Sequence, residues 1–206
     1  MKPHLVALKS GLVLAWAQSA LDSARKPAAL ARLSAPERER AELEPRAKLD
    51  SFLVGRILLR EAASVVSGIA AEALTVEARC PDCGGPHGAP GIRGASVFVS
   101  LAHCASMVVA VASVRGPVGV DVEELTEASP ARLAAIEALT GDESLRRWTR
   151  TEAILKADGR GLRVDPAELM FDGDTGWVRG GDARYRLSEP IVSPDVELSV
   201  AELVPA

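Results

Sequence analysis

The chain has 206 residues, of which 48% are hydrophobic and 25% charged, and its formal net charge at pH 7 is −4. A chain of this size can bury a substantial core, either as one large domain or as two domains of about 100 residues. The aromatic residues are three Trp, three Phe and one Tyr, few for stacking nucleic-acid bases, and the negative net charge argues against polyanion binding. The composition therefore favours a folded protein that does not bind nucleic acid.

Three cysteines, an odd number in a chain without a signal-peptide pattern, indicate a reducing compartment. The apolar stretch at residues 5–17 is interrupted by Lys9 and Ser10 and is too short to span a bilayer. We therefore expect a cytoplasmic protein that is not inserted in a membrane.

The first half of the chain is predicted to contain strands and helices. Runs of apolar and β-branched residues predict four strands, at residues 5–8, 12–16, 74–78 and 96–101. Helical spacing of apolar residues predicts three helices, at residues 23–32, 36–43 and 46–67. Ser34 suits the N-cap of the second helix, and Gly68 ends the third. The third helix is expected to bury four apolar side chains, Phe52, Leu53, Ile57 and Val65.

In the second half, residues 107–114 and 118–123 are predicted to form a hairpin across Arg115-Gly116-Pro117. Two helices follow, at residues 129–139 and 141–157. The remaining strands are predicted at residues 169–171, 177–179, 184–187 and 196–202. Strands, then helices, then strands occur twice along the chain, which predicts an α+β fold.

Two segments carry side chains that could bind a metal ion or a phosphate group. The segment G-V-D-V-E at residues 119–123 reads as a strand with Asp121 and Glu123 on one face. The segment W-T-R-T-E-A-I-L-K at residues 148–156 reads as a helix with Trp148, Glu152 and Lys156 along one side. Taken alone, the first pattern is more typical of a solvated strand face and the second of an exposed helical ion pair. If the carboxylates converge, they suit Mg²⁺, and the lysine supplies a charge for a phosphate group.

In this order the two segments resemble the signatures of the 4'-phosphopantetheinyl transferase superfamily, G-[VI]-D-[VI]-E followed by W-[ST]-x-K-E-[AS]-x-x-K. Upstream, S-L-A-H-C at residues 100–104 is similar to the family element S-[IVL]-[ST]-H-[ST]. C-P-D-C-G-G-P-H-G-A-P at residues 80–90 resembles the C-x-x-C-G-G-P-H-G-[KR]-P segment of actinobacterial members, and F-L-V-G-R-I-L-L-R at residues 52–60 resembles the helix that opens their core. The resemblance covers the chain from about residue 34 to residue 162.

The resemblance implies two similar α+β halves, residues 1–104 and 105–206, related by a pseudo-two-fold axis with the ligand in a cleft between them. It implies transfer of the 4'-phosphopantetheine arm of coenzyme A to a serine of an acyl or peptidyl carrier protein, with Mg²⁺ as cofactor and 3',5'-ADP as by-product. A monomer is expected, with coenzyme A and the carrier protein as partners and neither nucleic acid nor a membrane among them.

The same resemblance assigns roles to individual residues. Asp121, Glu123 and Glu152 would hold Mg²⁺ against the pyrophosphate, and Glu152, or a water held by the metal, would accept the serine proton. Lys156 would contact the α-phosphate and His103 the 3'-phosphate or pyrophosphate; a buried structural histidine is the alternative for His103. The basic residues expected near the coenzyme are Arg38 and Arg56, with Arg40, Arg46, Lys48 and Arg93 also available.

Four positions depart from the family pattern, and each lacks a phosphate-facing hydroxyl or positive charge: Ser51, Ala89, Ala102 and Thr151. Hydrogen bonds to charged groups contribute about 1.5–3 kcal/mol each, so coenzyme binding should be weakened unless other basic residues compensate. The alternative hypothesis is therefore a divergent, non-catalytic homologue that binds a carrier protein or an assembly partner.

Two further features stay open. Cys80 and Cys83 with His87 invite a zinc site, but a closed site needs a fourth ligand from His103 or Cys104. Family members contact the carrier protein with a segment that here contains Leu125, Leu133, Leu145, Arg146 and Arg147. Ordinary amphipathic helices explain most of these residues equally well.

Overall fold

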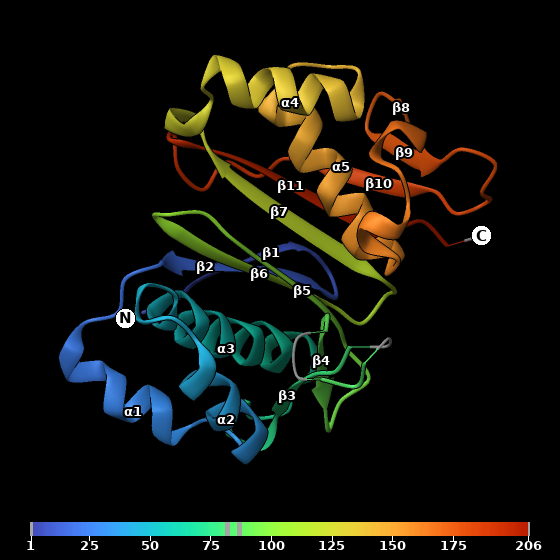
Figure 1. The fold of residues 1–206 in the computed structure, drawn as a ribbon. Helices are drawn as coiled ribbons and strands as arrows, with labels where there is room; N and C mark the ends of the chain where they lie inside the picture. Colours follow the sequence, from blue (N-terminus) through green and yellow to red (C-terminus); the bar gives the residue numbers. More distant parts are fainter. Residues whose placement is uncertain (1, 81–82, 86–87, 206) are drawn as a thin grey trace. The chain divides into compact units, whose positions relative to one another are not determined.

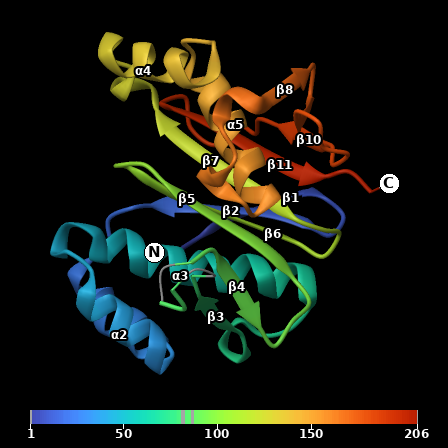
Figure 2. The same cartoon turned by 45° about the vertical axis from the view of Figure 1, so that its right-hand side comes forward.

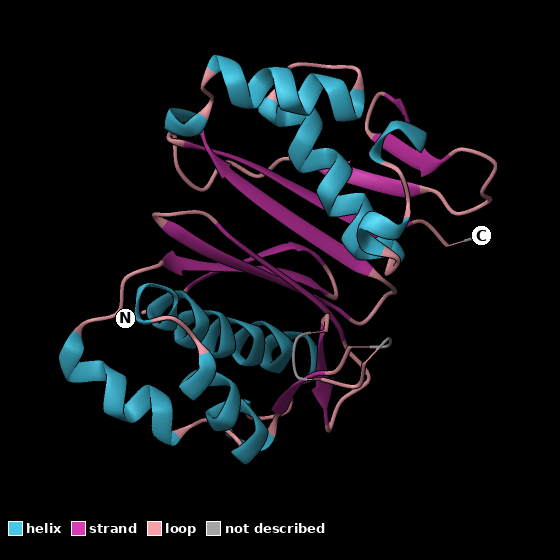
Figure 3. Ribbon diagram, viewed as in Figure 1, coloured by secondary structure: helices cyan, strands magenta, loops and turns pink. Residues whose placement is uncertain are grey.

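The computed structural model describes residues 2–80, 83–85 and 88–205. The protein is a mixed α+β structure with several antiparallel sheets, which confirms the predicted fold class (Figures 1 and 3). The chain divides into two compact units, Met1–Arg115 and Gly116–Ala206, described separately below. Among the described residues, none of the helices has the length and hydropathy needed to cross a bilayer.

The first unit is built on a four-stranded antiparallel sheet in the order β1-β2-β6-β5. Its strands are β1 (His4–Lys9), β2 (Leu12–Gln18), β6 (Met107–Ser113) and β5 (Phe98–His103). The two predicted N-terminal strands are thus confirmed and form a hairpin, and the chain returns to their sheet at Phe98. The long helix α3 (Arg46–Ser67) packs along this sheet in both views of the molecule (Figures 1 and 2).

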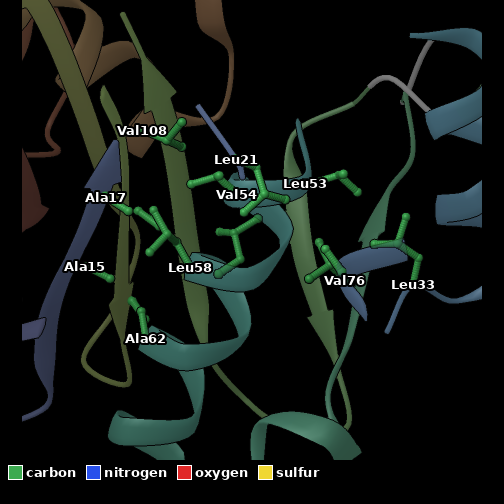
Figure 4. Close-up of a cluster of buried hydrophobic side chains, with 14 of the residues drawn as sticks. Ala15, Ala17, Leu21, Leu33, Leu53, Val54, Leu58, Ala62, Val76 and Val108 are labelled. Carbon is green, nitrogen blue, oxygen red and sulfur yellow. The ribbon is translucent and has the colours of Figure 1, made fainter. Parts of the chain in front are cut away.

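The core of the first unit lies between α3 and the sheet. Val54, Leu58 and Ala62 recur at helical spacing and are fully buried on the side of the sheet, whereas Leu53, also fully buried, points toward the side of Val76 and Leu33 (Figure 4). Gly68 ends the helix with φ 72°, as predicted. The expectation for Val65 is wrong, because this side chain is 57% exposed. Val66 packs against the core instead and continues the buried stripe, which leaves the neighbouring residue on the outer face.

Shorter elements complete the first unit: η1 (Ser23–Arg25), α1 (Lys26–Ala31), α2 (Ala35–Leu43), η2 (Ala71–Ala73), β3 (Thr75–Ala78) and β4 (Pro90–Arg93). Ser34 occupies the predicted N-cap of α2, where its backbone N–H donates to Glu37 over 2.8 Å. Strand β4 was not predicted, because Pro and Gly open it. It forms through its antiparallel pairing with β3.

The predicted hairpin of residues 107–114 and 118–123 is wrong, although both strands exist. β6 pairs with β2 and β5, whereas β7 (Val118–Glu124) pairs with β11 (Val196–Leu203). β5 and β6 form one antiparallel pair, so both belong to the first unit. The compact units therefore divide at residues 115 and 116 rather than at the expected residues 104 and 105.

The second unit has a five-stranded antiparallel sheet in the order β7-β11-β10-β9-β8. Its other strands are β8 (Leu169–Asp172), β9 (Thr175–Val178) and β10 (Tyr185–Ser188). Helix α5 (Leu145–Asp158) lies across β7 and β11 (Figures 1 and 2), and α4 (Pro130–Thr140) packs against α5. Three short 3-10 helices join these elements, η3 (Leu125–Glu127), η4 (Gly161–Arg163) and η5 (Pro166–Glu168).

Candidate functional site

The two chemically informative segments come together in the second unit, because β7 and α5 pack directly on each other. Gly119 permits this contact: a Cβ at this position would lie 2.7 Å from the backbone nitrogen of Ala157 and closer still to the carbonyl oxygen of Ala153. Side chains alternate along a strand, so Asp121 and Glu123 point to the same face as Gly119, toward α5. The strand pattern thus delivers both carboxylates to the helix that carries Glu152 and Lys156.

Asp121 is the most deeply buried carboxylate of the group, with 7% of its surface exposed. Its Oδ1 accepts a hydrogen bond from Lys156 Nζ over 2.7 Å, whereas its Oδ2 has no hydrogen-bond partner among the described residues. Burial raises the pKa of the Asp121 carboxyl to about 6 against the opposing effect of Lys156, and the charges of Glu152 and Glu123 add to the rise. A buried carboxylate oxygen beside two further carboxylates is a strong attractor for a cation.

Lys156 is held inside the site. Its ammonium group donates to Asp121 Oδ1 and, over 3.1 Å, to the carbonyl oxygen of Val120. Its side chain is 29% exposed, so one side of the group faces solvent. The ammonium has three N–H donors, and these two bonds leave one for a ligand oxygen.

Glu123 has both oxygens engaged by protein donors. Trp148 Nε1 donates to its Oε1 over 3.1 Å, and Arg132 of α4 donates to its Oε2 over 2.6 Å. Arg132 also donates to Glu127 over 2.6 Å. The predicted stripe of Trp148, Glu152 and Lys156 along α5 therefore does face β7, and Trp148 reaches Glu123.

Glu152 lies on α5 between Trp148 and Lys156 and is half-buried. Within the described part of the chain it forms neither a hydrogen bond nor an ion pair, and its charge acts on Asp121. Of the three carboxylates predicted to hold a metal, Glu152 has the most freely available oxygens.

The residues present are chemically suited to a hard divalent cation at Asp121 and Glu152. The unpartnered, buried Oδ2 of Asp121 is the observation that supports this fit, since oxygen donors are the ligands Mg²⁺ prefers. The described residues contain no preformed group of three or more His, Cys, Asp or Glu side chains in ligating geometry. Glu123 accounts for this in part, because Arg132 and Trp148 hold its oxygens.

In the first unit, a cavity of about 450 Å³ lies between α2, α3 and β3. Four arginines line it: Arg40, Arg56, Arg79 and Arg93. Arg56 is only 9% exposed, stacks on the Phe52 ring at 4.7 Å, and has no hydrogen-bond partner for its Nε among the described residues. Burial lowers the pKa of the Arg56 guanidinium, and Glu37 opposes this shift. Glu37, Glu39 and Glu77 line the cavity as well, and Glu37 pairs with Arg56 and Glu77 with Arg93, so the positive charge of the arginines is partly offset.

His103 lies at the end of β5 and is exposed, so the alternative of a buried structural histidine does not hold. It lines a cavity of about 420 Å³ together with Lys48 and Ser51. A third cavity, of about 230 Å³, is lined by His103, Lys48 and Arg40. The basic side chains Arg40 and Lys48 therefore link the arginine-lined cavity to His103.

The remaining basic residue assigned to the coenzyme, Arg38, is exposed and donates to the carbonyl oxygen of Leu33. It lines none of the three cavities described above. Its neighbour two residues along, Arg40, lines two of them. Helix α2 thus directs Arg40, rather than Arg38, toward these cavities.

The four departures from the family pattern differ in their surroundings. Thr151 is fully buried and its hydroxyl has no partner among the described residues, while Ala102 is 5% exposed. Ala89 is exposed, and the Ser51 hydroxyl donates to the carbonyl oxygen of Lys48 over 2.9 Å. Only the positions of Ala89 and Ser51 therefore give a ligand ready access.

The zinc hypothesis lies partly outside the described residues, since His87 is not among them. No disulfide joins Cys80, Cys83 or Cys104 to another described residue. The segment expected to contact a carrier protein is mixed: Leu125 is 46% exposed, but Leu145 is buried. Arg146 pairs with Glu189 over 2.9 Å, and Arg147 stacks on Phe171 at 4.0 Å.

Two residues of these sites were not singled out from the sequence, Arg132 and Arg79. Arg132 lies nine residues after Glu123 in an ordinary helical pattern, so no local signal marks it. Arg79 directly precedes the first Cys of the C-x-x-C segment, and that position was its only indication.

In comparisons with known proteins, no family model matches the chain and no curated protein matches it significantly.

Proposed function

We propose that this protein is a Mg²⁺-dependent 4'-phosphopantetheinyl transferase that moves the arm of coenzyme A to a serine of an acyl or peptidyl carrier protein. The observation that carries the proposal is the convergence of Asp121, Glu152 and Lys156 in the second unit. Lys156 Nζ lies 2.7 Å from Asp121 Oδ1, and the other Asp121 oxygen is buried without a hydrogen-bond partner among the described residues. The site therefore offers an ammonium group that can bind a phosphate and carboxylates that can bind a cation.

The basic cavities of the first unit support the part of the proposal that concerns coenzyme A. The arginine-lined cavity offers charge for a phosphate, and Lys48 and His103 offer two further donors along a connected path. Arg56 and Arg40 would therefore bind phosphate, with Arg38 as a peripheral charge.

The proposal includes two similar α+β halves in one chain. The long helix packed on an antiparallel sheet within each unit supports this similarity. We further propose a monomer in the cytoplasm, a reducing compartment that the odd number of cysteines favours.

In this reaction the residues have separate tasks. Asp121 and Glu152 would hold Mg²⁺, with Glu123 close by; when bound, the cation would offset negative charge on the pyrophosphate linkage as 3',5'-ADP leaves. Lys156 binds an oxygen of the transferred phosphate with its remaining N–H. Glu152 accepts the proton of the attacking serine hydroxyl, because it is the carboxylate without a protein partner among the described residues.

The test is transfer from coenzyme A to an apo carrier protein, followed by the intact mass of the carrier. Glu152→Gln and Asp121→Asn should each lower the rate by at least about 100-fold, because each removes charge from the reacting centre. Glu143→Gln, at an exposed position of the same unit, is the matched control and should transfer normally. Undiminished transfer by Glu152→Gln would refute the assigned roles.

The second candidate is a non-catalytic homologue that binds a carrier protein or an assembly partner. The engaged oxygens of Glu123 and the unfilled basic position at Ala89 favour it. Calorimetry with coenzyme A and Mg²⁺ separates the two candidates. An enzyme must bind coenzyme A, and no detectable binding at about millimolar ligand, roughly −4 kcal/mol, supports the second candidate.

A further inference from the structure

Arg132 occupies a fixed position between two carboxylates of the second unit. One guanidinium nitrogen lies 2.6 Å from Glu123 Oε2 and another lies 2.6 Å from Glu127 Oε2. Its backbone is fixed as well, because the N-cap Ser129 accepts a hydrogen bond from Arg132 N over 3.3 Å. The side chain is 32% exposed, whereas that of Glu123 is 15% exposed. The Arg132–Glu123 contact is thus partly shielded from solvent, where ion pairs are stronger than at the surface.

Glu123 is held from its other side too. Trp148 Nε1 donates to Oε1 over 3.1 Å, so each oxygen of this carboxylate has a donor from a different helix. An indole nitrogen and a guanidinium group can only donate hydrogen bonds. Each oxygen keeps a further lone pair, but a cation that coordinates Glu123 must approach the positively charged guanidinium of Arg132, which opposes its binding.

Asp121 and Glu152, in contrast to Glu123, have carboxylate oxygens without a protein donor among the described residues. Asp121 is 7% exposed and its Oδ2 has no hydrogen-bond partner among the described residues. Glu152 has oxygens free of protein donors in the same part of the chain. The three carboxylates therefore differ: Asp121 pairs with Lys156 through Oδ1 and keeps Oδ2 for a cation, Glu152 has no protein donor among the described residues, and Glu123 has both oxygens engaged.

We propose that Arg132 acts as an internal competitor for the cation site: it holds Glu123 away from the metal, so that this chain binds Mg²⁺ through Asp121 and Glu152 and with lower affinity than three free carboxylates would give. This inference rests on the cation site of the proposed function, not on carrier-protein transfer. Arg132 is a positioning residue, because it acts through Glu123 and touches neither the cation nor a substrate.

The inference predicts that loss of Arg132 strengthens Mg²⁺ binding, whereas loss of the Glu123 carboxylate hardly changes it. Arg132→Gln frees Glu123 and should increase the affinity for Mg²⁺ by about tenfold, in the range of a hydrogen bond to a charged group. Glu123→Gln in the natural chain should change the affinity less than about threefold, since Glu123 is not a ligand there. The double variant Arg132→Gln with Glu123→Gln should lose the gain, because the freed ligand is absent.

The experiment titrates the full chain with Mg²⁺ alone by calorimetry, and with Tb³⁺ by emission sensitised through the indole of Trp148. Glu127→Gln is the matched control: it removes the second partner of Arg132 and leaves its contact with Glu123, so the affinity should stay within about threefold. Circular dichroism melting confirms that each variant is folded.

The outcomes distinguish the two proposals. If Glu123→Gln alone abolishes Mg²⁺ binding, or if folded Arg132→Gln binds no more tightly, the role of Arg132 is refuted and the cation site stands. If neither ion binds to the natural chain or to Arg132→Gln, the cation site itself is refuted. If Arg132→Gln does not fold, the effect of Glu123→Gln in the natural chain still decides the question. It shows whether Glu123 is a ligand of the cation or is bound to Arg132 instead.

Discussion

Tyr185 is the only tyrosine of the chain, and its hydroxyl donates to Asp158 Oδ2 over 3.0 Å. The residue is 3% exposed. Burial raises the pKa of the Tyr185 phenol to about 12, and the neighbouring charge of Asp158 and its hydrogen bond add to the rise. Asp158 is itself kept ionised, because the hydrogen bond from Arg160 lowers its pKa. A buried phenol is thus fixed to a charged carboxylate at the end of α5.

This arrangement predicts an alkaline dependence of stability. In the unfolded chain the phenol titrates near pH 10, so the stability that its neutral form contributes is fully present below pH 10 and is lost as the pH rises toward 12. Because there is one tyrosine, ultraviolet absorbance of the phenolate reports this group alone. Asp158→Asn should lower the midpoint toward the ordinary value. A midpoint near 10 in the folded natural chain would contradict the burial argument.

At the scale of elements, the approach of α5 to β7 depends on Gly119. Gly119→Ala would place a methyl group against the helix backbone at Ala153 and Ala157, which cannot move aside as a flexible side chain can. We expect a loss of about 3 kcal/mol in the free energy of unfolding, measured with urea. Affinity for Mg²⁺ should fall as well, because Asp121 would be displaced from Glu152.

The control for this substitution is Gly91→Ala in β4, where a Cβ meets no atom within 4 Å. This change should alter the free energy of unfolding by less than about 0.5 kcal/mol. Equal losses at both positions would mean that Gly119 is not limited by close packing.

At the scale of the whole molecule, each unit has central strands and edges. In the first unit, β6 lies between β2 and β5 and its residues from Val108 to Ser113 are all buried. β1 is an edge strand, with a register irregularity between Ala7 and Lys9 and with Leu5 and Val6 exposed at about 40%. Its outward-facing amides have no strand beside them within the sheet.

Hydrogen exchange followed by mass spectrometry or NMR should reveal this difference. Amides of β6 should exchange at least about 100-fold more slowly than those of β1, because β6 opens only with the core of its unit. In the second unit, β11, between β7 and β10, should be the slowest. If β1 is protected as strongly as β6, another surface must cover this edge.

Much of the local structure was predictable because it depends on local chemistry. The end of α3 at Gly68, the N-cap Ser34, the start of α4 near residue 129, and the strands β7 and β11 follow from capping preferences and side-chain periodicity. The shared face of Asp121 and Glu123 follows from strand geometry alone. The positions of Glu152 and Lys156 on one side of a helix follow from its 3.6-residue period.

Only the tertiary structure decided which elements pair and which charges meet. Residues 107–123 read as a hairpin, yet β6 pairs with β2 and β7 with β11, because alternating apolar residues specify a strand without specifying its partner. Likewise no spacing rule brings Arg132 to Glu123, or Arg56 and Arg40 to one cavity. The sequence determined the carboxylates, the ammonium group and the elements that carry them. Long-range packing determined that Asp121 stays open while Glu123 is held, since hydrogen bonds between distant residues form only once the chain has folded.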